Sequence, residues 1–213
     1  MKHLSFWFDP ISPYAYLAFE RLPQVLEGVS YSVGYRPVLF AGLLKQFDHK
    51  GPAEIEPKRA WTYRDVAWRA HTQGTRLDLP VAHPFNPLPL LRLALACARP
   101  GGTPNRRVVE ALFHHVWQGG QDAASPDRLA ALRQALAPER DPDGAEVKAE
   151  LRAGGETALA QGVFGVPTMV CEGRLFWGDD ALPMLRAALQ GDPWFEGPGW
   201  AQADQPRPQV SRT

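Results

Sequence analysis

Ser12 and Pro13 stand at the start of a segment with helical periodicity, a position suited to holding an anion. Apolar residues recur at helical spacing from Tyr14 to Leu26, and Gly28 ends the run. The free N–H groups of a helix N-terminus stabilise a thiolate and lower its pKa, and a serine hydroxyl adds a further donor. Serine is also a favoured N-cap and proline a favoured first helical residue, so a purely structural role fits this stretch equally well.

Two segments near the C-terminus combine turn residues with potential binding groups. Val166 and Pro167 precede a predicted strand, where proline gives up a ladder donor, as is typical of a strand's first residue or of an edge. Gly178, Asp179 and Asp180 lie between a predicted hairpin and the last predicted helix. They fit a turn with an acidic N-cap, whatever else they do.

The sequence has no redox or metal motif. Its two cysteines, Cys97 and Cys171, are far apart and fall in apolar stretches, so they indicate core residues rather than a disulfide or a zinc pair. Glu110 and His114 share a helix face, but no third ligand follows at a suitable spacing. We therefore expect His114 and His115 to be surface or packed histidines, and we expect no bound metal.

The composition excludes several classes of function. The 213 residues carry 23 basic and 23 acidic side chains, so no net charge draws the protein toward nucleic acid or anionic lipid. Residues 1–8 are largely apolar, but Asp9 and Pro10 interrupt them well short of a signal peptide, and no apolar run approaches a membrane span. We expect a cytoplasmic protein without nucleic-acid or membrane partners.

The elements that must position these residues begin with a strand, a helix and a second strand. Apolar residues alternate over residues 4–8 and again over 31–35, and the predicted helix lies between the two. From Phe40 to about Gly155 the apolar spacing becomes helical, with Pro and Gly residues at the joins. This middle part is expected to be a block of helices.

After that block, a hairpin and a helix complete the pattern. Residues 167–171 and 175–177 form the two predicted strands around a tight turn, and Asp180 to Leu189 form the final predicted helix. The order βαβ, helical block, ββα predicts an α/β protein, a thioredoxin-like fold with an inserted all-helical domain. The predicted parts are two halves of a thioredoxin-like domain (1–40 and 156–192), the insert (41–155) and an extended or mobile tail (193–213).

Several pieces of the chain, in order, carry the motifs of one known family. They are Phe6 to Ala18 (FWFDPISPYAYLA), Arg36 to Leu39 with Gly42 and Lys45, Lys58 with Tyr63, Asp65 and Arg69, Pro84 to Pro87 (PFNP), Gly162 to Thr168 (GVFGVPT) and Phe176 to Asp180 (FWGDD). Together they span about residues 4 to 190 and resemble the 2-hydroxychromene-2-carboxylate isomerase family, which is similar in turn to kappa-class glutathione transferases. Because several motifs agree in order, the signal is specific.

The resemblance implies a DsbA-type thioredoxin fold that binds glutathione as a cofactor and has lost the redox cysteines. Ser12 to Ala15 stand where that superfamily carries Cys-x-x-Cys, so thiol-disulfide exchange is not expected. The family's active serine maps onto Ser12, which would be the catalytic residue and hold the glutathione thiolate ionised and aimed. The resemblance also implies a cis peptide bond before Pro167 and a backbone contact from Val166 to the cysteinyl part of glutathione.

The same resemblance places the γ-glutamyl end of glutathione at Trp177, Gly178, Asp179 and Asp180. Helix N–H groups would bind its carboxylate there, and an Asp side chain would accept from its ammonium group. Asp179 stands where relatives often have Gln or Ser. The choice between the two acids therefore stays open.

Lys45, Lys58 and Asn86 resemble the family's substrate-side positions. A substrate carboxylate that leaves water needs a cationic or amide partner, and these side chains would supply it. Each lysine also fits a solvated surface charge, and Asn86 also fits a turn. Residues 48–56 have no clear counterpart in the family, so the acceptor pocket could differ.

These observations predict a glutathione-dependent isomerase that converts 2-hydroxychromene-2-carboxylate, or a similar aromatic catabolite, to the trans-2-oxo-butenoate. Transient thiolate addition would open the ring and allow bond rotation, which replaces one high barrier by two lower ones. A kappa-like glutathione transferase is the nearest alternative. A non-catalytic, cysteine-less thioredoxin-fold binding protein is an alternative of another class, and the acidic turn argues against it. The resemblance also implies a homodimer.

Overall fold

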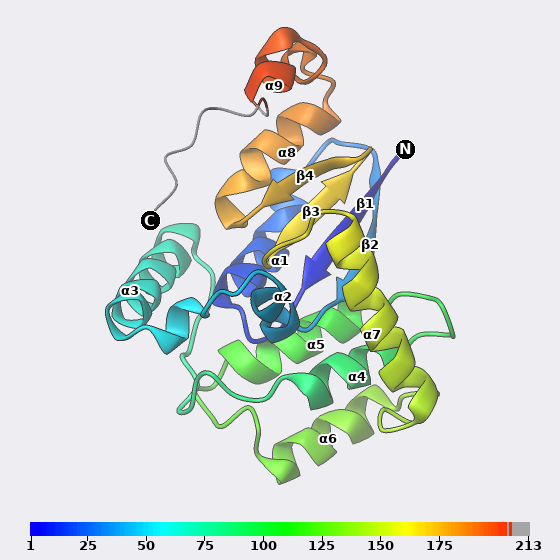
Figure 1. The fold of residues 1–213 in the computed structure, drawn as a ribbon. Coiled ribbons are helices and arrows are strands. Elements are labelled where there is room, and N and C mark those ends of the chain that lie inside the picture. Colours follow the sequence, from blue (N-terminus) through cyan, green and yellow to red (C-terminus); the bar gives the residue numbers. More distant parts are fainter. Residues whose placement is uncertain (204, 206–213) are drawn as a thin grey trace.

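The structure, a computed structural model, describes residues 1–203 and 205 and is built around a four-stranded sheet. Strands β1 (Lys2–Phe8), β2 (Tyr31–Pro37), β3 (Thr168–Cys171) and β4 (Arg174–Trp177) lie in the order β2-β1-β3-β4. β1 runs parallel to β2 and antiparallel to β3, and β3 and β4 form an antiparallel hairpin. Helices surround the sheet (Figure 1). The predicted α/β thioredoxin-like fold is confirmed.

The β1–α1–β2 opening follows from the apolar pattern of its sequence. Leu4, Phe6 and Phe8 of β1 are fully buried, and Phe6 pairs with Tyr35 of β2. Four residues separate β1 from helix α1 (Pro13–Val25), and the last of them, Ser12, is the N-cap of the helix. The predicted cap is therefore confirmed, and it fixes the position of this serine relative to the central strand.

The segment between β2 and β3 is helical, as predicted. Its elements are α2 (Phe40–Gln46), the 3-10 turn η1 (Pro52–Glu54), α3 (Glu56–Gln73), α4 (Leu88–Ala96), α5 (Arg106–Trp117), α6 (Pro126–Leu136) and α7 (Ala145–Ala160). In Figure 1, α4, α5 and α6 lie below the sheet, α3 stands beside α1, and α7 lies beside β2.

The helical block shares its core with the sheet. Phe113 and Trp117 of α5 belong to the same buried cluster as Phe6 and Phe8 of β1, and Phe113 lies 5.5 Å from Phe8 between ring centroids. The predicted boundary between residues 155 and 156 falls inside the continuous helix α7. Helix α7 packs against β2 as well as against α4, so it contacts both the sheet and the helical block.

The chain ends in a series of short helices after the hairpin. They are the 3-10 turn η2 (Asp179–Ala181), α8 (Leu182–Leu189), the 3-10 turn η3 (Pro193–Glu196) and α9 (Pro198–Ala203). The prediction of an extended tail is wrong for residues 193–203. Phe195 is buried and packs with Trp200 against Phe176, so these aromatic side chains hold the segment on the sheet. Residues 204 and 206–213 of the predicted tail lie outside the described residues.

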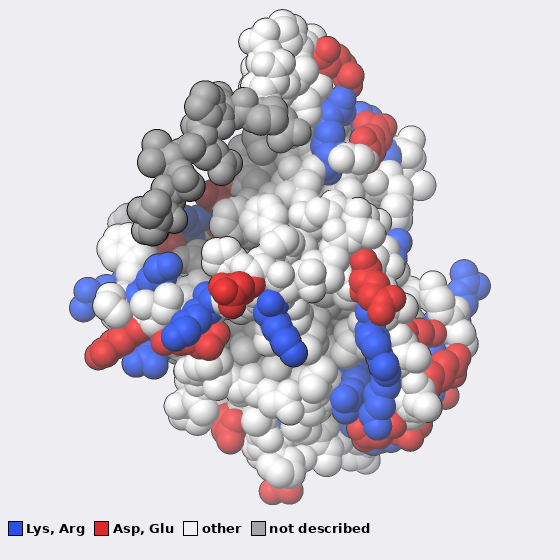
Figure 2. Space-filling model, in the orientation of Figure 1, with Lys and Arg blue, Asp and Glu red and all other residues white. Residues whose placement is uncertain are grey.

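The surface agrees with the balanced composition. Figure 2 shows acidic and basic side chains side by side on the same face of the molecule. None of the helices in the described part of the chain is long and apolar enough to cross a membrane.

Candidate functional site

The site is centred on Ser12, at the point where β1 gives way to α1. Its Oγ accepts a hydrogen bond from the Ala15 N–H at 3.2 Å and donates one to the carbonyl oxygen of Val166 at 3.3 Å. The serine is 7% exposed. Two segments more than 150 residues apart in the chain are thus joined through one hydroxyl group.

The loop before β3 contributes its backbone to the site. The Val166–Pro167 peptide bond is cis, as the resemblance implied. The carbonyl oxygen of Pro167 accepts from the Gly178 N–H at 2.9 Å, which ties the turn after β4 to the same loop. Among the described residues, no partner is found for the Val166 N–H. Val166 therefore offers its N–H to a ligand while its carbonyl accepts from the Ser12 hydroxyl.

The loop from Asp9 to Ser12 is held by residues from distant elements. The Trp117 indole donates to the Pro10 carbonyl at 2.9 Å, and the His83 ring contacts the Ile11 carbonyl at 2.8 Å. Burial lowers the pKa of His83. A neutral ring satisfies both of its contacts, because Nε2 donates to Ile11 while Nδ1 accepts from the Tyr63 hydroxyl at 2.8 Å.

Asp9, the first residue of this loop, carries a buried carboxyl group. It is fully buried, and its two oxygens accept from the Ile11 N–H at 3.1 Å and the Phe40 N–H at 2.9 Å. Burial raises its pKa to about 7, although the two hydrogen bonds oppose the shift. Asp9 therefore links the loop that carries Ser12 to the start of α2.

The backbone of Gly178, in the turn after β4, has a conformation that other residues adopt only with strain. Its φ is +99° and its ψ is 162°, a region that glycine alone occupies without strain. A Cβ atom at this position would lie 2.4 Å from Oδ1 of Asp180. Asp180 is exposed, so its carboxylate faces solvent next to the backbone of the turn.

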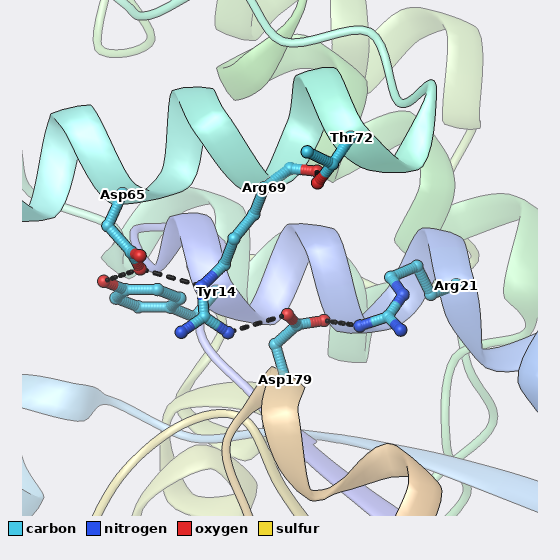
Figure 3. Close-up of polar contacts among 6 residues, drawn as sticks. All are labelled: Tyr14, Arg21, Asp65, Arg69, Thr72 and Asp179. Carbon is cyan, nitrogen blue, oxygen red and sulfur yellow. Dashed lines mark hydrogen bonds and ion pairs between the residues drawn. The ribbon is translucent and has the colours of Figure 1, made fainter.

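Asp179 points the other way, into the protein, as Figure 3 shows. It is 1% exposed, and its two oxygens form ion pairs with Arg21 at 3.1 Å and Arg69 at 3.3 Å. These two arginines occupy both carboxylate oxygens, so Asp179 has little capacity left for a ligand. Of the two acids that the sequence left open, Asp180 is the one whose carboxylate faces solvent.

The same ion pairs reach the first turn of α1. Arg69 also pairs with Asp65 at 2.8 Å, and Asp65 accepts from the Tyr14 hydroxyl at 2.9 Å (Figure 3). Burial, together with the hydrogen bond to Asp65, raises the pKa of Tyr14 to about 12. A continuous polar network therefore connects α3, α1 and the turn that carries Asp179.

The remaining predicted positions lie on the surface. Lys45 and Lys58 are exposed, and no ion-pair partner for either is found within residues 1–203 and 205. Asn86 is also exposed, and its side chain accepts from the Leu88 N–H at 3.1 Å, which is the turn role that its sequence also fitted. Trp177 is 53% exposed and packs against Phe164 at 4.9 Å between ring centroids.

The histidines and cysteines take structural positions. His114 contacts Glu20 at 3.1 Å and His115 contacts the Ala123 carbonyl at 2.9 Å. Cys171 is buried and Cys97 is half-buried, and both are free thiols. Within the described residues, no group of three His, Cys, Asp or Glu side chains is arranged to hold a metal ion.

The sequence analysis gave no role to Asp9, Arg21 and His83, which hold the elements around Ser12 and Asp179, although Asp9 lies within the Phe6 to Ala18 motif. Tyr14, Asp65 and Arg69 were noted as motif members but without a role. Acidic and basic residues at helical spacing, such as Asp65 and Arg69, were the only local signal for the ion pairs. The other partners come from different elements, so the sequence alone does not pair them.

This arrangement suits the binding of an anionic sulfur rather than redox chemistry. The N-terminus of α1 supplies a partial positive charge, and the Ser12 hydroxyl turns from Val166 to a ligand by rotation about one bond. The N–H of Val166, which has no partner among the described residues, and the exposed Asp180 add a donor and an acceptor. Together they outline a site for a short peptide with a thiol and an ammonium group.

Comparison with known proteins agrees with this geometry. The family model of the DSBA-like thioredoxin domain matches residues 3–190. A 2-hydroxychromene-2-carboxylate isomerase of Sphingobium xenophagum is 27% identical over 198 residues, which cover 88% of this chain and 98% of that protein. Glutathione S-transferase kappa 2 of Caenorhabditis elegans is 27% identical over 215 residues, which cover 92% and 95%.

The fold comparison gives the same result. A solved structure of 2-hydroxychromene-2-carboxylate isomerase matches with a TM-score of 0.76 at 21% identity, over 95% of this chain and 100% of that one. The resemblance to these isomerases and to kappa-class transferases, first seen in the motifs, is thus confirmed. Because the family model covers nearly all of the described residues, the chain belongs to the DSBA-like thioredoxin domain family.

Proposed function

We propose that the protein is a glutathione-dependent isomerase that acts on 2-hydroxychromene-2-carboxylate or a similar aromatic acid. The observation that carries the proposal is the Ser12 hydroxyl, placed at the N-terminus of α1 and 3.3 Å from the carbonyl of the residue before the cis proline. The relatives named as isomerases and kappa-class glutathione transferases support both the cofactor and the reaction class.

The residues of the site fit glutathione. The backbone of Val166 would pair with its cysteinyl part through the N–H that has no partner among the described residues. Asp180 would accept from the γ-glutamyl ammonium group, because its carboxylate is exposed whereas that of Asp179 is occupied. Gly178 lacks a Cβ atom and so leaves room for the carboxylate of Asp180, whose Oδ1 would lie 2.4 Å from such an atom.

Bound glutathione would supply a thiol that serves as the nucleophile toward a conjugated carbon of the substrate. The chain's own part is to hold that sulfur as an anion. The helix N-terminus lowers the pKa of a thiol placed there, and the Ser12 hydroxyl donates to the charge and fixes its direction. Burial of Ser12 and of the loop that carries it restricts the side chain, so rotation of the hydroxyl from Val166 to the sulfur is the only reorganisation that this donor needs.

The test is the ultraviolet difference spectrum of glutathione titrated onto the protein near neutral pH. We expect a thiolate band with the wild type and its loss with Ser12→Ala. Ser125→Ala is the matched control, because Ser125 is also an N-cap followed by proline at the first helical position. The Ser125→Ala variant should show the same thiolate band as the wild type. No band with the folded wild type would exclude the proposed cofactor chemistry.

A kappa-like glutathione transferase is the second candidate, favoured by the likeness to the Caenorhabditis elegans enzyme over 92% of the chain. Both activities use the same activated sulfur, so the fate of the thiol separates them. An isomerase turns over 2-hydroxychromene-2-carboxylate without consuming glutathione. A transferase consumes one thiol for each electrophile converted, which a thiol titration of the reaction mixture measures.

A further inference from the structure

A groove lies where α2, α4 and α7 meet, apart from the residues of the Ser12 site. Its volume is about 420 Å³, within the range of small-molecule sites. Its floor is apolar and consists of leucines from all three directions: Leu39, Leu43, Leu88, Leu151 and Leu159. Such a surface favours an apolar body that would otherwise be hydrated.

The groove also carries an excess of positive charge. Three cations line it, Arg92, Lys148 and Arg152, against the single carboxylate of Glu156. Within the described part of the chain, no salt bridge engages Lys148 or Arg152. In Figure 2, Lys and Arg side chains gather over α7, beside the surface where α2 and α7 approach each other. An anion would therefore find complementary charge at the edge of an apolar floor.

Arg92 shows an unmet hydrogen-bond need at this place. Its Nε atom is buried, and no partner for it is found among the described residues. The ion pair of Arg92 with Asp143 is long, 3.7 Å, and the side chain of Asp143 is 67% exposed, so this pair is weak. The buried Nε itself is out of reach of a ligand, but the Arg92 side chain is 24% exposed and lines the groove. A carboxylate there would meet a guanidinium group that, among the described residues, forms only the weak ion pair with Asp143.

Gly155 keeps part of the groove open. It lies in the interior of α7, where glycine is less favourable than alanine. A Cβ atom built on Gly155 would meet no atom within 4 Å, so the space above it is open to the groove. The neighbouring Gly154 instead faces the Pro37 carbonyl at 3.6 Å and does not line the groove.

We propose that this groove binds a small amphipathic carboxylate, an aromatic ring system bearing one carboxylate, with the ring on the leucine floor and the carboxylate on Arg92. The site is distinct from that of Ser12, since none of the groove residues contacts Ser12 through a hydrogen bond. Leu43 lines the groove and also packs in the buried cluster that contains Val166. A ligand in the groove would therefore contact Leu43, which packs in the same cluster as Val166.

The test uses 2-naphthoate as the probe, titrated onto the full chain and followed by its fluorescence. Gly155→Leu fills the groove and Arg92→Met removes the charge, and each should weaken binding at least tenfold. Gly154→Ala, the matched control on the same helix, should bind like the wild type. The neutral analogue 2-naphthamide should bind at least tenfold more weakly than 2-naphthoate. An unchanged melting temperature would show that the variants are folded.

Two results would overturn the proposal. One is binding of 2-naphthoate that Gly155→Leu leaves unchanged, which would place the probe elsewhere, including the Ser12 site. The other is equal binding of 2-naphthoate and 2-naphthamide, which would mean that the groove binds the ring system alone and does not recognise the carboxylate. The thiolate band of bound glutathione should persist in Gly155→Leu, so failure here is distinguishable from failure of the proposed enzyme function.

Discussion

Replacing Asp9 by asparagine should change how the stability of the protein depends on pH. In the folded protein this carboxyl is fully buried and burial raises its pKa to about 7, whereas its ordinary value is 3.8. Between these two values the folded protein keeps the Asp9 proton while the unfolded chain has lost it. The native state then binds more protons, so the free energy of unfolding falls as pH rises.

The size of the effect follows from the two pKa values. A difference of about 3 units corresponds to about 4 kcal/mol in all, and about 3 kcal/mol of it falls between pH 4.5 and pH 8. Wild type should lose this amount over that interval from Asp9 alone. Asp9→Asn, which does not titrate, should lose none of it, so the variant gains relative to wild type as pH rises.

The measurement is urea unfolding at several pH values, followed by the fluorescence of the seven tryptophans. Asp78→Asn is the control with the opposite sign. The hydrogen bond from the Gly119 N–H lowers the pKa of Asp78, so its contribution is present at neutral pH and is lost in acid. Parallel profiles for wild type and Asp9→Asn would refute the reasoning, because they would mean that Asp9 is ionised in the folded protein throughout this range.

Three further substitutions test the network around the turn after β4. Asp179→Ala removes the acid that Arg21 and Arg69 share, although Arg69 keeps its ion pair with Asp65. Because both arginines are partly exposed, the variant should lose about 2–3 kcal/mol of stability, or about 4–12 °C in melting temperature. An unchanged melting temperature would contradict the two ion pairs of Asp179. Gly178→Ala should cost about 1–3 kcal/mol and weaken glutathione binding by displacing Asp180, as calorimetry would show. Tyr14→Phe removes the hydroxyl bound to Asp65 and should cost about 1 kcal/mol in urea unfolding, with no loss if that hydrogen bond is absent.

Much of the fold was accessible from the sequence because it depends on local periodicity. Alternation of apolar residues locates β1 and β2, and a tight turn locates the β3–β4 hairpin. The tail was mispredicted because its stability comes from the contact of Phe195 with Phe176, a pairing between segments that composition does not register. The proposed end of the inserted block, next to Gly154 and Gly155, lies within α7, because these two glycines weaken a helix without ending it.

The candidate site divides in the same way. The capping role of Ser12 is encoded within four residues, and the structure confirms it. The orientation of Asp179 is not local, because two arginines from α1 and α3 decide that it faces inward while Asp180 faces solvent. The burial of Asp9 is not local either, because it depends on the packing of distant helices over its loop. The local sequence around Asp9 and Pro10 indicates only a turn.

The ion pairs of Asp179 also constrain how this chain can diverge. The acid and its two arginines come from three separate elements, and loss of both arginines would leave Asp179, which is 1% exposed, as an uncompensated buried charge. Replacement of Asp179 alone by a neutral residue gives a less stable intermediate, whereas replacement of the acid and both arginines does not. We therefore expect Asp179, Arg21 and Arg69 to change together in evolution. A homologue with a neutral residue at the position of Asp179 is expected to have lost at least one of the two arginines as well.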